Sequence, residues 1–227
     1  MMRARLIAIA AAFTVIAAAA RPGNAQPKPA GRCAPMDTTA AWFLKQRDWA
    51  DDSKHSWSND SLRMALVHAA GLDANPSAGA GALLGYEVAG TPNATGVGDD
   101  AAALDLLRKL SQNRQATWPT KSVVGAQGVR AVWLLAARDS AIARVALHRM
   151  MEAGPEESPP AAVAMLEDRL RIAAGRKQLY ATQLVRSANG TLEPAPLEDP
   201  KHVDLRRDAA GLPPLAQSLC AASLRKP

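Results

Sequence analysis

The stretch TWPTKSVVGAQGVRAVWLLAARD, residues 117–139, decides the fold because it predicts one helix with apolar side chains on nearly every side. Pro119 holds its neighbour Trp118 outside helical geometry, and Thr120 or Ser122 can cap the helix that follows. A helix that is apolar nearly all round is buried rather than laid on a surface. We therefore expect this stretch to form the central helix of the domain.

Start and stop signals predict further helices on both sides of the central one. Capping residues, apolar stripes at helical spacing and closing glycines recur along the chain, and Ser158 can cap while proline fills the first turn of the helix after it. The expected helices are Thr39 to about Asp52 after Asp37 or Thr38, Asn59 or Asp60 to Gly71, Asp99 or Asp100 to about Leu110, Ser140 to Glu152, and one from the Ser158-Pro159-Pro160 start to near Gly175.

The pattern changes after Gly175, where residues 178–196 alternate in polarity around Asn189-Gly190. Asn-Gly between alternating segments is a strong hairpin signal. Two short helices are expected to close the chain, at residues 203–210 and 215–223. The predicted fold class is therefore mainly α, a helical bundle-like domain with one C-terminal β-hairpin.

The predicted domain organisation follows these signals. N-terminal helices occupy residues 37–73, and a helical core with the hairpin occupies residues 99–223. Residues 74–98 are poor in charge and rich in glycine, alanine and proline, so we interpret them as a loop or insertion with a short strand at Leu84 to Val88.

Residues 1–25 have the features of a secretory signal peptide. Arg3 and Arg5 precede an apolar run, and small residues before a cut at Ala25 suit a signal peptidase. The run is shorter than the roughly 20 residues that a membrane helix needs. We expect cleavage near Ala25, a Pro/Gly-rich tether over residues 26–36, and a periplasmic or secreted bacterial protein that is not an integral membrane protein.

The charge balance gives little support for nucleic acid as a partner. The whole chain has a net charge of +6, and loss of three arginines with the predicted signal peptide lowers it to +3. The remaining charges are interspersed, without a run of lysine or arginine that would form a basic stripe. No nucleic-acid partner is predicted.

Two cysteines remain after the predicted cleavage, Cys33 and Cys220. In an oxidising compartment, a pair of this kind forms a disulfide bond by default. The alternative is a lipid-modified Cys33, but Arg32 is the wrong residue to precede such a cysteine. We predict the Cys33–Cys220 disulfide.

Several polar side chains stand on helices that are otherwise apolar. Gln127, Arg130 and Arg138 share one sector of the central helix, and Arg169 projects from the middle of an apolar arc. A buried guanidinium stays charged and needs an acceptor, for which Asp139, Asp168 and Asp73 are candidates. Either a structural ion-pair network or a ligand-binding cleft accounts for these residues.

Other motifs give weaker indications of chemistry. Gly125 and Gly128 follow Lys121-Ser122 and resemble an anion-holding helix terminus, but the glycines that a phosphate loop carries before its lysine are missing. Close backbone packing is the favoured interpretation. The four histidines lack a ligand spacing, so no metal and no cofactor is predicted. A nucleophile elbow is missing, and cysteines in a disulfide cannot serve as thiol nucleophiles.

Separated motifs over about residues 100–220 resemble a large bacterial family of uncharacterised function. The motifs are Trp118-Pro119-x-Lys121-Ser122-x-Val124-Gly125, Gly128, Ala131, Trp133-Leu134-Leu135, Leu166-x-Asp168-Arg169, Gly175-x-x-Gln178-x-Tyr180-x-Thr182-Gln183, Pro194-x-Pro196-x-x-Asp199-Pro200 and Gly211-Leu212-x-Pro214-Leu215. The resemblance implies a mostly helical domain that ends in a hairpin, and it implies no known activity.

The chain departs from this resemblance at two places. Relatives usually carry Gln-His where this chain has Ala137-Arg138, and Tyr-Gly-Thr-Gln where it has Tyr180-Ala181-Thr182-Gln183. Histidine is a natural general base near neutral pH, whereas arginine is not deprotonated in proteins. If the histidine of the relatives is catalytic, this chain has lost or changed the reaction.

Our leading functional hypothesis is a non-enzymatic, exported domain that binds a small anionic or polar ligand, or a protein partner. An alternative is a hydrolase or transferase that uses Asp168 or Tyr180 as acid or base, and a third is a structural interaction protein whose arginines clamp helices. The candidate binding cluster consists of Lys121, Gln127, Arg130, Arg138, Asp139, Asp168, Arg169, Gln178, Tyr180 and Gln183.

Overall fold

The structure is a computed structural model that describes residues 33–34, 37–53, 56–73, 85–88, 100–113 and 117–224. The predicted signal peptide, most of the predicted tether and most of residues 74–98 lie outside these ranges. The described residues form eight α-helices and a small three-stranded mixed sheet, which confirms the mainly α class. No helix among them is both long and apolar enough to cross a membrane.

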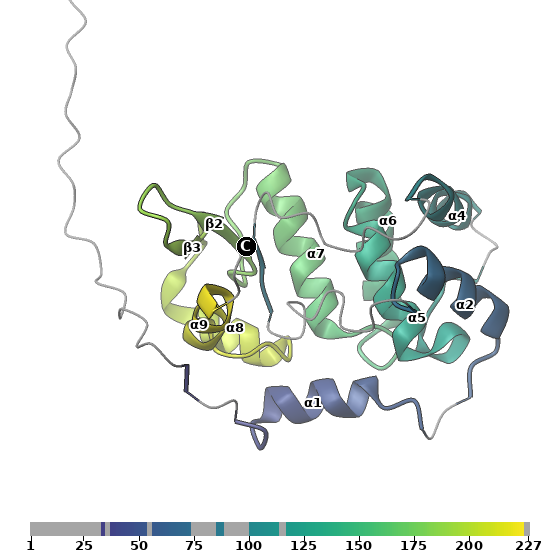
Figure 1. The fold of residues 1–227 in the computed structure, drawn as a ribbon, viewed down its shortest axis with the longest axis horizontal. Helices are drawn as coiled ribbons and strands as arrows, with labels where there is room; N and C mark the ends of the chain where they lie inside the picture. Colours follow the sequence, from purple (N-terminus) through teal and green to yellow (C-terminus); the bar gives the residue numbers. More distant parts are fainter. Residues whose placement is uncertain are drawn as a thin grey trace, which may run out of the picture.

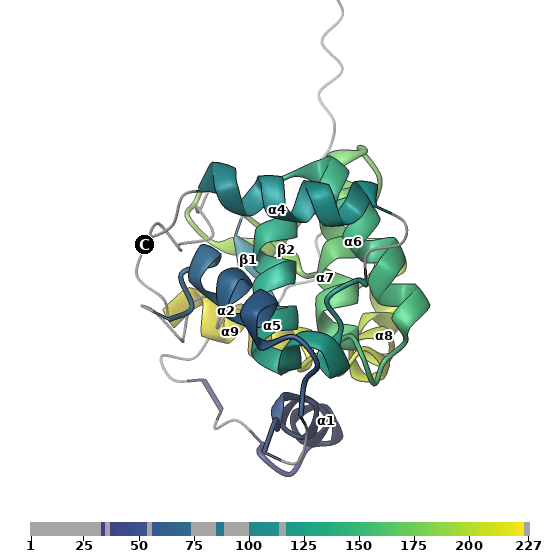
Figure 2. The same cartoon turned by 90° about the vertical axis from the view of Figure 1, so that its right-hand side faces the viewer.

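Helix α5 (Lys121–Ala136) lies at the centre, and twelve of its sixteen residues are buried. Figures 1 and 2 show it packed among its neighbours, with α7 standing between α5 and the strands. The prediction of a buried central helix is confirmed. These neighbours, which together with α5 we call the helical core, are α2 (Asp60–Ala69), α4 (Asp100–Gln112), α6 (Ser140–Ala153) and α7 (Pro160–Ala173).

Helix α5 is broken at Gly125, which has φ 69° and ψ 171°, and the sequence pattern did not predict this break. The helix restarts at Ala126, whose backbone N–H donates to both carboxylate oxygens of Asp52 at 3.0 Å. A Cβ at Gly125 would lie 3.0 Å from both Asp52 and Trp57. The helix terminus near these glycines therefore holds an anion, and the anion is a carboxylate of the same chain.

The prediction for the cap of α5 is confirmed in position only. Thr120 occupies the N-cap position without a capping hydrogen bond from its side chain, while Ser122 donates its backbone N–H and its hydroxyl to Glu157. Gly128 does pack closely, because a Cβ there would lie 2.6 Å from Cβ of Val124. The first turn of α5 is thus fixed by a glutamate 35 residues away in the sequence.

Of the caps predicted for the first two helices, the cap of α2 is confirmed and the cap of α1 is wrong. Asn59 caps α2 by accepting from the Leu62 N–H. Helix α1 (Ala41–Ala50) begins later than predicted and its N-cap is Ala40, because the Asp37 carboxylate is used in a local turn with Thr39.

Ser158 does not cap α7, so that prediction is also wrong. The N-cap of α7 is Pro159, and the Ser158 hydroxyl is buried with no hydrogen-bond partner in the described part of the chain.

The predicted hairpin is present, and a third strand extends it. Strand β2 (Gln183–Arg186) pairs antiparallel with β3 (Leu192–Pro194) across the Asn189-Gly190 turn. Strand β1 (Glu87–Val88) pairs parallel with β2, with Glu87 opposite Gln183. The strand expected at Leu84 to Val88 is therefore real but shorter, and it makes the sheet mixed.

Three short helices complete what we call the hairpin end, defined as β1 together with residues 174–224, which contain β2, β3, η1, α8 and α9. They are the 3₁₀ helix η1 (Pro200–His202), α8 (Val203–Ala209) and α9 (Leu215–Leu224), and only η1 was not expected from the sequence. A small apolar cluster fills this end, formed by Tyr86, Leu184, Leu192 and Ala222.

Helix α1 connects the two parts of the molecule. It runs below them in Figure 1, in contact with both α5 and α8, and the Gln46 amide donates to the carbonyl oxygen of Gly211 at 2.6 Å. The predicted disulfide between Cys33 and Cys220 is confirmed, and it ties the segment before α1 to α9 across 187 residues of sequence. In the chain-entropy account, closing so long a loop stabilises the folded state by up to about 5 kcal/mol.

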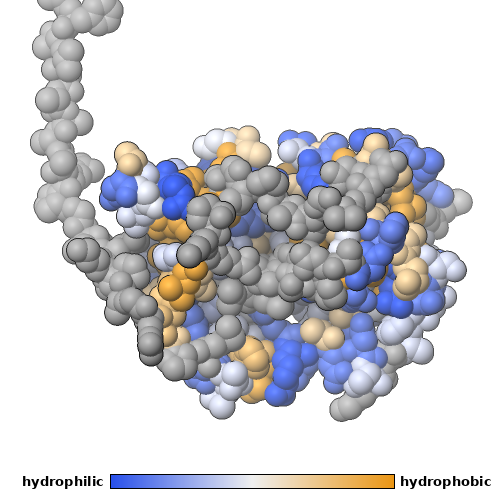
Figure 3. Space-filling model, viewed as in Figure 1, coloured by the Kyte–Doolittle hydropathy of each residue, from blue (hydrophilic) through white to orange (hydrophobic). Residues whose placement is uncertain are grey.

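On the face seen in Figure 3, hydrophobic residues gather in small patches separated by hydrophilic ones. Scattered apolar residues are normal on a folded surface, whereas a concave apolar patch with convergent polar groups indicates a binding site. A concave surface is therefore the better candidate for a binding site than these scattered patches.

Candidate functional site

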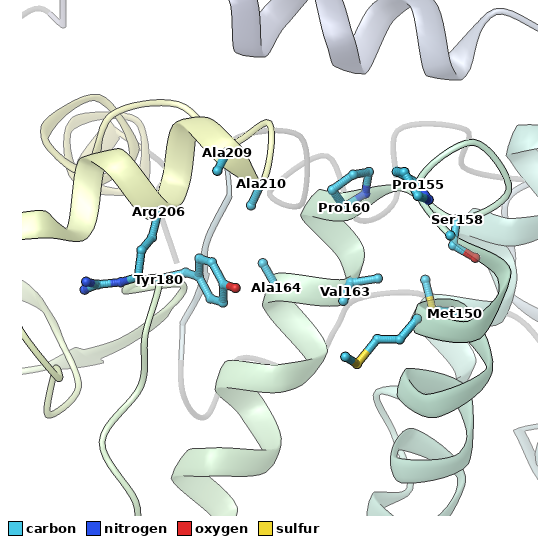
Figure 4. Close-up of a pocket in the computed structure, with 12 residues that line it drawn as sticks. Met150, Pro155, Ser158, Pro160, Val163, Ala164, Tyr180, Arg206, Ala209 and Ala210 are labelled. Atoms are coloured by element: carbon cyan, nitrogen blue, oxygen red, sulfur yellow. The ribbon is translucent and has the colours of Figure 1, made fainter.

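A pocket of about 390 Å³ opens where the C-terminal end of α6, helix α7 and helix α8 meet (Figure 4). It lies between the helical core and the hairpin end, so each part contributes walls. Its volume falls within the range of small-molecule sites. The pocket is lined by Met150, Met151, Gly154, Pro155, Ser158, Pro160, Val163, Ala164, Tyr180, Arg206, Ala209 and Ala210.

Tyr180 is the one member of the predicted cluster that lines this pocket. Figure 4 shows its hydroxyl pointing toward α7. Burial raises the pKa of this hydroxyl, and the nearby carboxylates of Glu167 and Asp168 raise it further. The phenol therefore stays neutral near pH 7 and can both donate and accept a hydrogen bond.

Asp168 fixes the backbone on which Tyr180 stands. Its carboxylate is fully buried and accepts hydrogen bonds from the backbone N–H groups of Leu179, Tyr180 and Thr182, and from the Thr182 hydroxyl. A carboxylate that accepts several backbone donors is held rigidly and holds the loop in return. Asp168 is thus an anchor for the segment that enters the hairpin.

Arg207 holds the same segment from the other side. Its guanidinium is fully buried and donates to the carbonyl oxygens of Tyr180 (2.7 Å) and Pro213 (2.6 Å), and to the Ser218 hydroxyl. Burial lowers the pKa of Arg207 to about 10, although Asp204 and Asp168 oppose that shift. Arg207 was not predicted from the sequence. The available signal was that it shares a face of α8 with the buried Val203 and Ala210.

Ala181 explains one departure from the resemblance. It has φ 55°, in the left-handed region, although it is not a glycine. Residues with a Cβ are strained there, whereas glycine adopts this conformation readily. The glycine that similar sequences carry at this place suits the backbone turn, and this chain accommodates alanine instead.

Arg206 lines the pocket through its side-chain stem, while its charge is used elsewhere. The guanidinium donates to the carbonyl oxygens of Leu179, Glu198 and Asp199 at 2.8–2.9 Å. In Figure 4 it points away from the Tyr180 hydroxyl. The positive charge of Arg206 therefore secures the backbone rather than facing the pocket.

Glu167 lies next to the pocket and was not predicted. It is half-buried on α7, and burial raises the pKa of its carboxyl, followed by the negative charge of Asp168; Arg171 and Arg176 oppose the shift. Within the described residues, no donor hydrogen-bonds to this carboxylate. Its spacing of three residues from Ala164 and four from Val163, one helical turn, was the signal that could have identified it.

The predicted acceptors of Arg169 are wrong. Its guanidinium pairs with Glu87 on β1 at 3.1 Å, because the parallel strand β1 runs beside β2 close to α7. Asp168 anchors the loop as described, Asp139 caps α6 by accepting from Ala141 and Ile142, and Asp73 bonds His68.

Two of the three predicted glutamines, Gln178 and Gln183, lie in the same neighbourhood as Arg169. The Gln183 amide donates to Glu87 at 3.0 Å. Gln178 is fully buried, donates to the carbonyl oxygens of Gln183 and Ala195, and accepts from the Gln183 N–H. Asp168, Arg169, Gln178, Tyr180 and Gln183 therefore come together around the start of the hairpin, and four of them hold structure there.

The predicted members on or beside α5 lie apart from the pocket. Lys121 stands over the ring of Trp49 at 5.3 Å, and Gln127 accepts from Arg63 at 3.1 Å. Arg130 is half-buried, and burial lowers its pKa. Neither Arg130, Arg138 nor Arg169 lines the pocket described above. A cavity shared by these three arginines stays a prediction.

The chemistry that this arrangement offers is recognition. The pocket joins apolar walls to a neutral phenol and a nearby carboxylate, whereas Asp168, the other acid in the area, has its oxygens taken by four donors. Among the residues that the structure describes, no group of three or more His, Cys, Asp or Glu side chains could hold a metal ion.

These features define a mainly α domain with a β-hairpin followed by short closing helices, in which a buried aspartate and a buried arginine hold the segment that enters the hairpin. Residues 90–222, more than half of the chain, match a family of unknown function, DUF6624, and the protein belongs to that family. Searches among curated proteins and among solved structures each gave no match.

Proposed function

We propose that this protein is an exported binding protein whose site is the pocket between α6, α7 and α8. The ligand is a small molecule with an apolar body and a polar group that reaches Tyr180. The observation that carries this proposal is the neutral Tyr180 hydroxyl pointing toward α7 within a pocket of about 390 Å³. An apolar cavity with few convergent polar groups is the usual form of a small-molecule site.

The walls and the polar groups support the same ligand class. Met150, Pro160, Val163 and Ala164 offer apolar surface, and the Tyr180 hydroxyl offers a hydrogen-bonding group beside them. Burial of apolar surface favours binding, and a single polar group orients the ligand.

A catalytic role for Asp168 has little support. A general acid or base must face the substrate with a free lone pair or proton, and the Asp168 oxygens are occupied by donors from Leu179, Tyr180 and Thr182. The raised pKa of Tyr180 makes its phenolate harder to form at neutral pH. The anionic ligand expected from the arginines stays a prediction, and the pocket lining favours a neutral or cationic ligand.

The disulfide bond supports a location outside the cytoplasm. The Cys33–Cys220 disulfide is consistent with an oxidising compartment, and the predicted signal peptide with cleavage near Ala25 accounts for the route. We propose a periplasmic or secreted location, with a small molecule rather than nucleic acid as the partner.

A series of 1-alkanols from four to eight carbons tests the proposal by titration calorimetry. Each added CH₂ contributes about 0.8 kcal/mol when buried, so affinity should rise about fourfold per carbon until the pocket is full. Ala209 is exposed at the pocket wall, and Ala209→Trp should abolish binding by filling the space. Ala141→Trp, at the opposite end of α6, is the matched control and should retain it. Saturable binding that survives Ala209→Trp, or none in the wild type, would overturn the proposal.

A further inference from the structure

We infer that Glu167 makes this pocket selective for a ligand with a protonated amine, an alkylammonium group at the end of an apolar body. The inference rests on the proposed function, since it concerns what the same pocket prefers. The proposed function requires only an apolar body and a polar group.

Glu167 stands one turn of α7 beyond two residues of the pocket wall, and its negative charge acts on Tyr180, which lines the pocket. Val163 and Ala164 line the pocket, and Glu167 follows them by one helical turn. Side chains on a helix lean toward its N-terminus, so the Glu167 side chain lies over the turn that carries these two residues. Tyr180 faces the same turn from the hairpin end.

The surrounding charges leave this carboxylate without a matched cation. Arg171 donates to the Lys177 carbonyl and pairs with Glu198, and the guanidinium of Arg206 is spent on three backbone carbonyls. Arg176 is exposed to solvent, where its charge is screened. Asp168 adds a second negative charge close by. A half-buried carboxylate in this setting is stabilised by an arriving cation.

The pocket recognises an ammonium group rather than another cation. The Tyr180 hydroxyl accepts an N–H, and a tyrosine ring attracts an ammonium through its face. A metal ion would require several oxygen or nitrogen ligands, and the described residues offer no such group here. A carboxylate ligand would be repelled by Glu167 and Asp168. The combination of apolar walls, phenol and acid therefore fits an alkylamine.

The test compares hexylamine, 1-hexanol and hexanoate by titration calorimetry at pH 8, where the amine is protonated and hexanoate is ionised. A charged hydrogen bond exceeds a neutral one, so hexylamine should bind about tenfold more tightly than 1-hexanol, and hexanoate more weakly than either. In Glu167→Gln, the ratio of amine to alcohol affinity should fall to near one. Glu156→Gln removes an exposed carboxylate on the loop before α7 and should keep the tenfold ratio.

The outcomes separate the two claims. Absence of saturable 1-hexanol binding in the wild type overturns the proposed function. Binding of 1-hexanol without a preference for hexylamine, or a preference that survives Glu167→Gln, overturns the amine selectivity alone. A circular dichroism spectrum and a melting curve verify that Glu167→Gln is folded, which is expected because the substitution keeps the size of the side chain.

Discussion

The helical core and the hairpin end of this protein are stabilised in different ways. Around α5, buried aliphatic and aromatic side chains from five helices form one large cluster. The hairpin end has only a small apolar cluster, and buried polar groups, above all Asp168 and Arg207, connect its loops. Apolar packing tolerates exchange among side chains of similar volume, whereas a buried polar network fails when one member is removed.

The pocket lies where the helical core and the hairpin end meet, and each region contributes a different kind of group to its wall. The helical core supplies apolar walls from α6 and α7, while the hairpin end supplies Tyr180 on a loop that hydrogen bonds hold in place. A binding group on a rigidly held loop is better positioned than one on a free loop. The polar network of the hairpin end thus supports function as well as stability.

The largest expected effect comes from Asp168→Ala, which breaks the hairpin end. The change leaves three backbone N–H groups and one hydroxyl without their buried acceptor. We expect the free energy of unfolding to fall by about 4 kcal/mol, measured by urea denaturation. The exposed Asp208→Ala on α8 is the control and should change it by less than about 0.5 kcal/mol. Equal effects of the two substitutions would mean that the network does not hold this end together.

The second largest effect is expected at the break in α5, and it tests how much the Asp52 cap contributes to the stability of the helical core. Gly125→Ala should lower the free energy of unfolding by about 3 kcal/mol, since it strains a left-handed backbone and displaces the Asp52 cap. Gly175→Ala is the matched control, because Gly175 also has positive φ but has open space where a Cβ would lie. It should lose only the backbone term, about 1 kcal/mol. If both variants lost the same amount, the contact with Asp52 would contribute nothing.

A smaller effect is expected at Ala181, where the backbone of the hairpin end is strained. Ala181→Val should destabilise by about 2 kcal/mol because a β-branched side chain rarely adopts positive φ and the site is fully buried. Ala181→Gly should stay within about 1 kcal/mol of the wild type, since relief of strain offsets the lost methyl group. Thermal unfolding of the two variants measures these effects. An Ala181→Val variant as stable as the wild type would contradict the proposal that positive φ strains this position.

The smallest effect concerns Glu167, which sits between the two regions. Burial raises the pKa of its carboxyl in the folded state, so the folded protein binds this proton more tightly than the unfolded chain. Stability from this group is present below the unfolded pKa of about 4.3 and is lost as the pH rises through the higher folded pKa. Glu167→Gln should therefore be more stable than the wild type at pH 7, with a smaller difference at pH 4. Urea denaturation at both pH values measures it, and the opposite order would show that Glu167 has a stabilising partner.

The helices and the hairpin could be predicted because their signals are local. Asn59 caps α2 by accepting from an N–H three residues later, and Asn189-Gly190 turns two adjacent strands. The pairing of distant polar groups could not be predicted in this way. Arg169 meets Glu87 across 82 residues, and nothing near either residue in the sequence specifies the other.

The same reasoning accounts for what was missed at the site. Tyr180 was identified through the resemblance, and Asp168 first as a candidate acceptor for Arg169. The role of Asp168 as an anchor depends on how the chain folds back after α7. The break at Gly125 depends on Asp52, which reaches α5 from 74 residues away. Glu167 and Arg207 did carry a local signal, since each shares a helix face with residues that line the pocket or the small core.

The most direct test of the central claim, that the ligand site lies where the helical core and the hairpin end meet, is a two-dimensional ¹H–¹⁵N NMR titration with 1-hexanol. Saturable shifts should cluster at the amides of residues 150–154, 163–164, 179–181 and 209–210. Shifts confined to α2, α4 and the N-terminal half of α5, with Tyr180 unmoved, would place the site elsewhere and contradict the claim.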